Sequence, residues 1–225
     1  MINLFRCQEN NFGDNLSTYL THKVSGMEVN NVTGEVAGQP VYAVIGSILE
    51  WVPSHAEVWG VGYQRATSRA ADKPLTIHAV RGKLTRDLLI KQGFDCPDVY
   101  GDPALLCPRY YTPLPVEHRK LGIVPHYVDW GSATVEKYRS DPDVRTMDVR
   151  GPIERVIDGI CSCGAIITSS LHGLIIADAY GIPAQWTQWS NKVIGDGFKF
   201  RDNFSVRHNV DLDKLMEACP FKGDS

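Results

Sequence analysis

The sequence of 225 residues lacks any long apolar run, and none approaches the ~18 apolar residues that a membrane-spanning helix needs. Residues 1–14 contain neither a long apolar core nor a cleavage site, so we expect no signal peptide there. The formal net charge is only −3, which gives no sign of a general nucleic-acid binder. We therefore expect a cytoplasmic protein, with peripheral contact to a membrane left open.

The cysteines lack the spacing of a disulfide framework or a zinc site. Only Cys161 and Cys163 lie close together, and no second Cys or His pair accompanies them. We expect buried, reduced thiols and no metal. Gly60-Val61-Gly62 is only a fragment of a GxGxxG fingerprint, so the signal for a dinucleotide is weak.

A segment typical of α/β proteins is present at residues 165–183. An apolar, β-branched run at 164–168 predicts a buried strand, and apolar residues at helical spacing from Leu171 predict a helix that ends near Gly181. Ser169 and Ser170 are residue types that cap helices, and they are candidate contacts for a ligand. His172 falls in the first helical turn, where free N–H groups and the helix dipole attract anions. It is a candidate acid–base group, although a capped surface histidine would fit the same pattern.

The same strand–loop–helix pattern occurs at the N-terminus. Residues 2–7 predict a strand and residues 16–24 a helix. Open α/β sheets bind ligands in the loops after their strands. The polar loop between these elements therefore supplies candidate site residues, namely Asn11, Gly13, Asp14 and Asn15. A plain helix-capping turn is the alternative for this loop.

Three further strands are predicted at residues 41–45, 57–61 and 75–80. Gly46 follows the first of them and would allow a ligand to approach the backbone closely. Arg81 follows the third and could hold a phosphate or carboxylate through its planar fork. A structural arginine paired with an acid such as Asp102 is the alternative for Arg81.

A proline-containing segment at residues 108–120 is the best candidate linker, because the strand–helix pattern begins again after it. We place the boundary at 113/114, which gives an N-terminal α/β domain over 1–113 and a C-terminal one over 114–225. In the second unit His126 lies in the exit loop of a strand predicted at 121–124. The sequence thus predicts an α/β fold of two doubly wound, Rossmann-like domains facing a cleft.

The segment after Pro183 combines aromatic and basic residues. Trp186 and Trp189 could stack on a sugar, although interior packing is the more common position of tryptophan. Gly195 and Gly197 predict a mobile loop over 195–202. Two basic residues of this loop, Lys199 and Arg201, could close over an anion.

Eight ordered segments together resemble the polysaccharide pyruvyl transferase family. They are NFGDN (11–15), IGSIL (45–49), VWGVG (58–62), VRGKLTRDLL (80–89), GDPALL (101–106), IVPHY (123–127), ITSSLHGLIIADAYGIPAQW (167–186) and KFRD (199–202). They keep the family's order over most of the chain.

The resemblance implies transfer of the enolpyruvyl group of phosphoenolpyruvate onto a sugar, giving a pyruvate ketal, and a fold similar to GT-B glycosyltransferases. Phosphoenolpyruvate is then the donor, and a sugar, free or in a lipid-linked oligosaccharide, is the acceptor. No metal or bound organic cofactor is implied. The anion-binding arginine of the family corresponds to Arg81 and its Leu-His motif to Leu171-His172. Many members have an arginine where this chain has Ser170, so Lys199 or Arg201 would supply that contact.

His172 is then the proposed acid–base, with Asp14 or His126 as the base on the acceptor side. Two other interpretations stay open: a nucleotide-sugar glycosyltransferase of GT-B type, and a non-catalytic sugar-binding protein. Preference for a nucleotide sugar over phosphoenolpyruvate would favour the first, and absence of turnover would favour the second.

Overall fold

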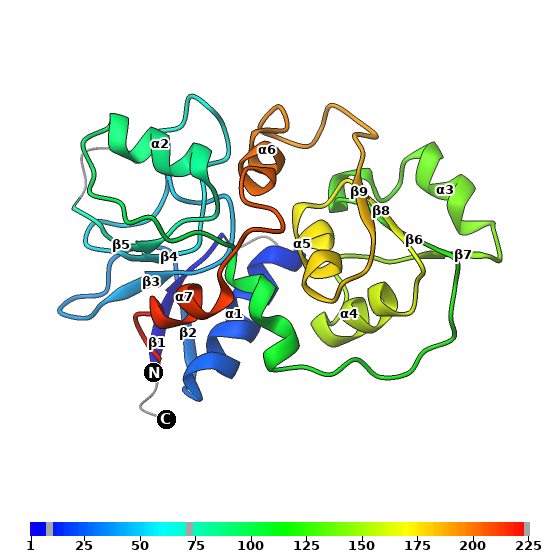
Figure 1. Cartoon of the computed structure of the whole chain (residues 1–225), viewed down its shortest axis with the longest axis horizontal. Helices are drawn as coiled ribbons and strands as arrows, with labels where there is room; N and C mark the ends of the chain where they lie inside the picture. The colour runs from blue at the N-terminus through cyan, green and yellow to red at the C-terminus, as the bar shows by residue number, and fades with distance from the viewer. Residues whose placement is uncertain (8–10, 71–73, 223–225) are drawn as a thin grey trace.

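The computed structural model describes residues 1–7, 11–70 and 74–222, which form two parallel β-sheets with helices around them (Figure 1). The first sheet has strand order β2-β1-β3-β4-β5, and the second has order β7-β6-β8-β9. Every strand pairing in these sheets is parallel. The chain is therefore an α/β protein, and its two sheets are compatible with the two Rossmann-like units predicted from the sequence.

The first sheet contains β1 (Ile2–Phe5), β2 (Val29–Val32), β3 (Val41–Ala43), β4 (Glu57–Trp59) and β5 (Thr76–Ala79). Figure 1 shows α2 (Lys83–Lys91) on one side of this sheet and α1 (Phe12–Ser25) with α7 (Leu212–Glu217) on the other. Successive side chains of a strand point to opposite faces. Leu4 accordingly belongs to the same core cluster as Leu16 of α1, whereas Phe5 belongs to the cluster of Leu89 of α2.

The second sheet contains β6 (Leu121–Val124), β7 (Val144–Thr146), β8 (Ile166–Thr168) and β9 (Ala184–Trp186). Its helices are α3 (Ala133–Arg139), α4 (Ile153–Cys161) and α5 (Leu171–Ala179), and a short 3-10 helix, η2 (Tyr127–Asp129), follows β6. Residues 110–120 connect the two sheets without a helix or a ladder strand. Strand β9 was not predicted from the sequence.

The chain has two halves, the first built on the sheet β2-β1-β3-β4-β5 and the second on the sheet β7-β6-β8-β9, and one hydrophobic core extends through both. Helix α5 packs on the 3-10 helix η1 (Pro103–Arg109) of the first half, and α1 contacts η1, α4 and α5. One buried cluster includes Leu16 of α1, Leu106 of η1 and Leu174 of α5. Almost the whole circumference of α5 is apolar and buried, which is typical of a helix inside a core. The halves are therefore held together by packing as well as by the connecting segment.

The end of the chain, which follows the second sheet in the sequence, packs against the first half. Helix α6 (Phe198–Phe204) packs on α2, and α7 packs on η1. The indole Nε1 of Trp59 donates a hydrogen bond of 2.8 Å to the carbonyl oxygen of Leu215. The mobile loop expected over 195–202 is wrong for residues 198–202, because these belong to α6, which the buried Phe198 and Phe200 anchor.

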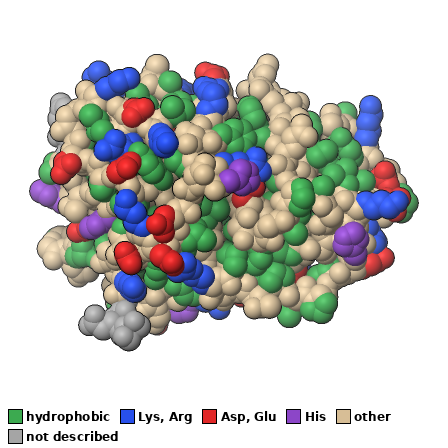
Figure 2. Space-filling view, in the orientation of Figure 1, with side chains coloured by type: hydrophobic (Ala, Val, Ile, Leu, Met, Phe, Trp, Pro, Cys, Tyr) green, Lys and Arg blue, Asp and Glu red, His purple; other side chains and the backbone are tan. Residues whose placement is uncertain are grey.

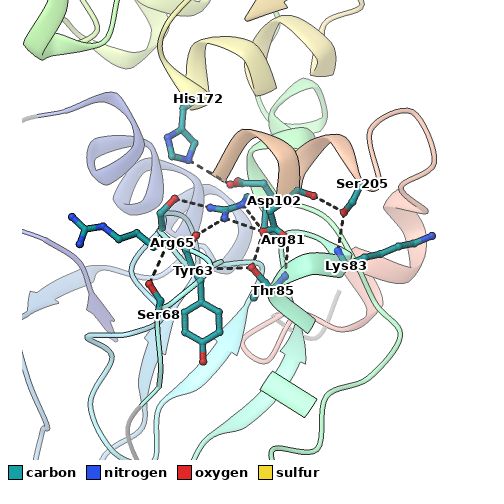
Figure 3. Close-up of polar contacts among 11 residues, drawn as sticks. Tyr63, Arg65, Ser68, Arg81, Lys83, Thr85, Asp102, His172 and Ser205 are labelled. Carbon is teal, nitrogen blue, oxygen red and sulfur yellow. Dashed lines mark hydrogen bonds and ion pairs between the residues drawn. The ribbon is translucent and has the colours of Figure 1, made fainter. Parts of the chain in front are cut away.

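A buried ion pair fixes α6 to the first half (Figure 3). The Arg81 guanidinium donates through Nε to Oδ2 of Asp202 at 3.0 Å, and both side chains have 0% exposure. Thr85 donates to the same carboxylate through its backbone N–H at 2.8 Å and its hydroxyl at 2.7 Å. The remaining Arg81 donors reach Oγ of Ser47 at 2.7 Å and the carbonyl oxygen of Tyr63 at 2.8 Å. Arg81 therefore joins α6 to the loops after β3 and β4.

The surface seen in Figure 2 carries basic and acidic side chains interspersed over the first half. This distribution agrees with the small net charge of −3. None of the helices in the described parts of the chain is both long and apolar enough to cross a lipid bilayer.

Asp202→Asn should strongly destabilise the protein. The substitution keeps the shape of the side chain but leaves the Arg81 guanidinium buried without its counter-ion, which costs about 3–5 kcal/mol. Urea unfolding measures this loss. The matched control is Asp213→Asn, which breaks a largely exposed pair with Arg109 and should cost less than about 1 kcal/mol. Equal losses in the two variants would contradict the role assigned to the buried pair.

Candidate functional site

A cavity of about 610 Å³ lies between the two halves. Its walls include residues 11–14, 46–48, 50 and 51, which follow β1 and β3, and residues 126–128 and 170–172, which follow β6 and β8. The strand order reverses between β1 and β3 in the first sheet and between β6 and β8 in the second. Open α/β sheets bind ligands at such switch points, beyond the carboxyl ends of the strands. Here the switch points of both sheets face one cavity, which makes it the candidate active site.

The cavity brings together most of the residues singled out in the sequence. Its lining includes Asn11, Gly13, Asp14, Gly46, His126, Ser170, His172 and Lys199. Among the described lining residues it does not include Asn15, Arg81, Ser169 or Arg201.

These four side chains make contacts within the protein. The donors of Arg81 are directed to Asp202, Ser47 and Tyr63, so its paired acid is Asp202 and not the suggested Asp102. Ser169 donates to Asp129 at 2.7 Å and accepts a hydrogen bond from the backbone of His126. Asn15 accepts a hydrogen bond from Arg6, and Arg201 donates to the backbone of Asp196. We therefore leave these four residues out of the proposed ligand contacts.

His172 faces a buried carboxylate (Figure 3). Its Nε2 lies 3.4 Å from Oδ2 of Asp102, and neither atom has a hydrogen-bond partner among the described residues. The other oxygen, Oδ1, caps η1 by accepting from the backbone N–H of Ala104 at 3.0 Å. Asp102 has 0% side-chain exposure and His172 has 12%. Asp102 is therefore placed to hold a proton on Nε2 and to stabilise a charged imidazole.

Two helix N-termini meet at the His172 imidazole. Ser170 caps α5, and Asn11 caps α1 by accepting from the backbone N–H of Asp14 at 3.1 Å. A Cβ built on Gly13 would overlap Nδ1 and Cε1 of His172, so glycine permits this close approach. The positive ends of both helix dipoles therefore face the same region, which favours an anion there.

Lys199 supplies a desolvated positive charge on the cavity wall. Its side chain is mostly buried, and no ion pair between it and a carboxylate is formed within the described ranges. Burial lowers the pKa of its amine to about 8, and the positive charge of Arg81 contributes to the same shift. A lysine amine that lies on a cavity wall without a carboxylate partner is well suited to bind an anionic group of a ligand.

His126 lies on the same wall and is uncharged at neutral pH. Burial lowers its pKa to about 4, and the charge of Lys199 and the nearby His172 shift it in the same direction. Its Nδ1 accepts a hydrogen bond of 3.4 Å from the backbone N–H of Val128. This contact assigns the ring proton to Nε2, so that His126 is a hydrogen-bond donor on its other side.

Several residues of the site were not predicted from the sequence. Asp102 was named only as a partner of Arg81, although the Asp102-Pro103 sequence is typical of a helix start. Trp51 and Glu50 line the cavity from the turn after β3. Trp186, which was considered for sugar stacking, instead stacks on Phe200 of α6, with the ring centroids 4.5 Å apart. Among the described residues, no group of three or more His, Cys, Asp or Glu side chains is arranged to hold a metal ion.

Lys199→Met should stabilise the protein at pH 7. The pKa of the amine is 10.5 in the unfolded chain and about 8 in the folded one, so the charged form is disfavoured by folding. The unfolded chain then binds more protons between these values, and the stability lost at pH 7 returns as the pH rises through this window. We expect a gain of roughly 1–3 kcal/mol at pH 7 that shrinks toward pH 10.5 in urea unfolding.

Lys192→Met is the matched control, because Lys192 also lines the cavity but is exposed. It should show no such pH-dependent gain. A gain for Lys199→Met that is the same at both pH values would contradict the assigned pKa.

Comparison with known proteins supports the resemblance found in the sequence. A family model described as polysaccharide pyruvyl transferase matches residues 57–191. The chain is 30% identical over 223 residues to the uncharacterized protein L143 of Acanthamoeba polyphaga mimivirus, covering 93% of this chain and 75% of that protein. It is 28% identical over 208 residues to the succinoglycan biosynthesis protein ExoV of Rhizobium meliloti (strain 1021), covering 87% of this chain and 61% of ExoV.

The family model covers more than half of the chain and includes the segments that carry His126, Asp102 and His172. On this evidence the chain belongs to the polysaccharide pyruvyl transferase family and is a transferase.

Proposed function

We propose that this protein transfers the three-carbon skeleton of phosphoenolpyruvate to two hydroxyl groups of a sugar, forming a pyruvate ketal and releasing phosphate. Family membership supports the reaction class, and the name of ExoV connects a relative to the biosynthesis of succinoglycan. We also propose that the two sheets correspond to the two domains of a GT-B arrangement, with the reaction taking place between them.

The observation that carries this proposal is the set of positive groups around His172. Phosphoenolpyruvate has a phosphate and a carboxylate, so its site needs cations and backbone donors. The N-termini of α1 and α5 supply donors, and Lys199 supplies the charge. Many family members have an arginine where this chain has Ser170, and we assign its role to Lys199 here.

His172 is the proposed proton donor. The positive ends of the two helix dipoles disfavour a positively charged His172 ring, whereas the negative charges of Asp102 and a bound phosphate stabilise it. Asp102 and the bound donor would therefore stabilise the protonated ring during proton transfer. Transfer of that proton to the methylene carbon C3 converts it to a methyl group and leaves positive character at C2.

The acceptor hydroxyl then bonds to C2 and gives its proton to a base. Asp14 is the proposed base, because it lines the cavity in the first turn of α1 beside the glycine that contacts His172. His126 is the weaker candidate, since its assigned proton already occupies Nε2. The C2–O bond to phosphate breaks, the second hydroxyl closes the ketal, and its proton leaves with the phosphate. The sum is phosphoenolpyruvate plus a diol giving ketal plus inorganic phosphate.

Substitutions at His172, Asp102 and Lys199 test these roles separately. His172→Asn should lower kcat by roughly 10²–10⁴-fold while phosphoenolpyruvate still binds, because only the proton donor is lost. Asp102→Asn should lower kcat, because the imidazolium loses its counter-ion. Lys199→Ala should chiefly raise the KM for phosphoenolpyruvate.

The measurement is phosphate release with product mass, paired with calorimetric titration of phosphoenolpyruvate. His118→Asn, an exposed histidine outside the cavity lining, is the control and should behave as the wild type. Wild-type turnover by His172→Asn would exclude it as the proton donor. Tighter binding of a UDP- or GDP-sugar than of phosphoenolpyruvate would instead favour the glycosyltransferase alternative.

A further inference from the structure

An exposed tryptophan forms part of the cavity wall on the side of the first half. Trp51 is 48% exposed, and Ile194, which also lines the cavity, is 51% exposed. Glu50 and Gln64 line the cavity as well, so hydrogen-bonding groups and apolar surface occur together. Exposed apolar surface at a cavity beside such polar groups is typical of a binding site.

The turn that presents Trp51 is held firmly. Its neighbours Leu49 and Val52 are fully buried, and the backbone N–H of Trp51 donates to the carbonyl oxygen of Ile48 at 2.9 Å. Leu49 is tied in the same way to Gly62 at 3.3 Å. The exposure of the indole therefore follows from a fixed backbone rather than from a loosely attached loop.

The polar groups differ between the two sides of the cavity. His126, His172 and Lys199 come from the second half and from α6, where they suit an anionic ligand. Around Trp51 the first half contributes the carboxylate of Glu50 and the amide of Gln64, together with the exposed Arg65 at the surface. Carboxylates accept hydrogen bonds from hydroxyl groups and repel a phosphate, so a hydroxyl-rich neutral ligand fits this side better.

We propose that Trp51, with Glu50, Gln64 and Ile194, forms the subsite for a pyranose ring of the acceptor. The C–H face of the ring would pack on the indole, and its hydroxyls would donate to Glu50. As an account of the acceptor this rests on the proposed function, but binding of the sugar does not require catalysis. A membrane surface fits less well, because the Glu50 carboxylate would be repelled by anionic headgroups and desolvated by lipid.

The test is saturation-transfer NMR with methyl β-galactopyranoside and methyl β-glucopyranoside as probes. Trp51→Ala should weaken binding of the probe that the wild type prefers by about three- to tenfold, and Trp51→Phe should retain most of the affinity. Trp189→Ala is the matched control, since Trp189 lies outside this lining and contacts Tyr138. Calorimetric titration of phosphoenolpyruvate should give the same affinity for all four proteins.

Equal sugar binding by the wild type and Trp51→Ala would overturn the proposal, as would the absence of any signal from either probe with the wild type. Loss of binding to phosphatidylglycerol vesicles in Trp51→Ala, with sugar binding unchanged, would assign the indole to a membrane contact and overturn it too. Failure to bind phosphoenolpyruvate together with Trp51-dependent sugar binding would refute the proposed function and leave the sugar subsite standing.

Discussion

The packing of α5 on η1 is the contact on which the rest of the site depends. Each helix places one side chain of the candidate site at its start: Asp102 caps η1, and His172 lies in the first turn of α5. Because the two helices are packed together through buried apolar residues, the carboxylate and the imidazole meet in a place that neither sheet could create alone. Helix α1 joins the same core and brings Gly13 against the ring.

The site also imposes costs on the fold. Lys199 keeps an amine buried without an ion-pair partner among the described residues, and Nε2 of His172 and Oδ2 of Asp102 are buried without hydrogen bonds there. Groups of this kind destabilise a folded protein unless a ligand or a partner satisfies them. The Arg81–Asp202 pair and the shared core stabilise the elements that hold them. Lys199, His172 and Asp102 already have their positions in the folded protein. An anionic ligand that satisfies them would therefore bind without a further free-energy cost for arranging these side chains.

Local patterns predicted much of this arrangement. The strands predicted at 121–124 and 164–168 and the helix predicted from Leu171 agree closely with the structure, since apolar periodicity and capping residues are properties of short segments. His126 and His172 were found in the same way, because each follows the carboxyl end of a strand. Strand β9 was missed because its three residues leave too little alternation to detect.

Long-range contacts account for the remaining differences. Arg81 looked like a ligand-binding residue, yet its partner Asp202 comes from a segment that was expected to be a mobile loop. That segment is a helix because Phe198 and Phe200 are buried against other elements, which no local pattern reveals. Asp102 and Trp51 likewise acquire their positions only through the fold. The sequence shows that Arg81, Asp202 and Asp102 are charged residues, but it does not show which side chains contact one another in the fold.

The central claim is that C3 of phosphoenolpyruvate receives a proton from a group that exchanges with solvent, while the three-carbon unit passes to the sugar. The most direct measurement is the reaction in D₂O with phosphoenolpyruvate and an acceptor glycoside, followed by NMR and mass analysis of the product. The account predicts a ketal whose methyl group carries one deuterium, formed together with inorganic phosphate. A ketal methyl group free of deuterium, or phosphate released without transfer of the three-carbon unit, would contradict it.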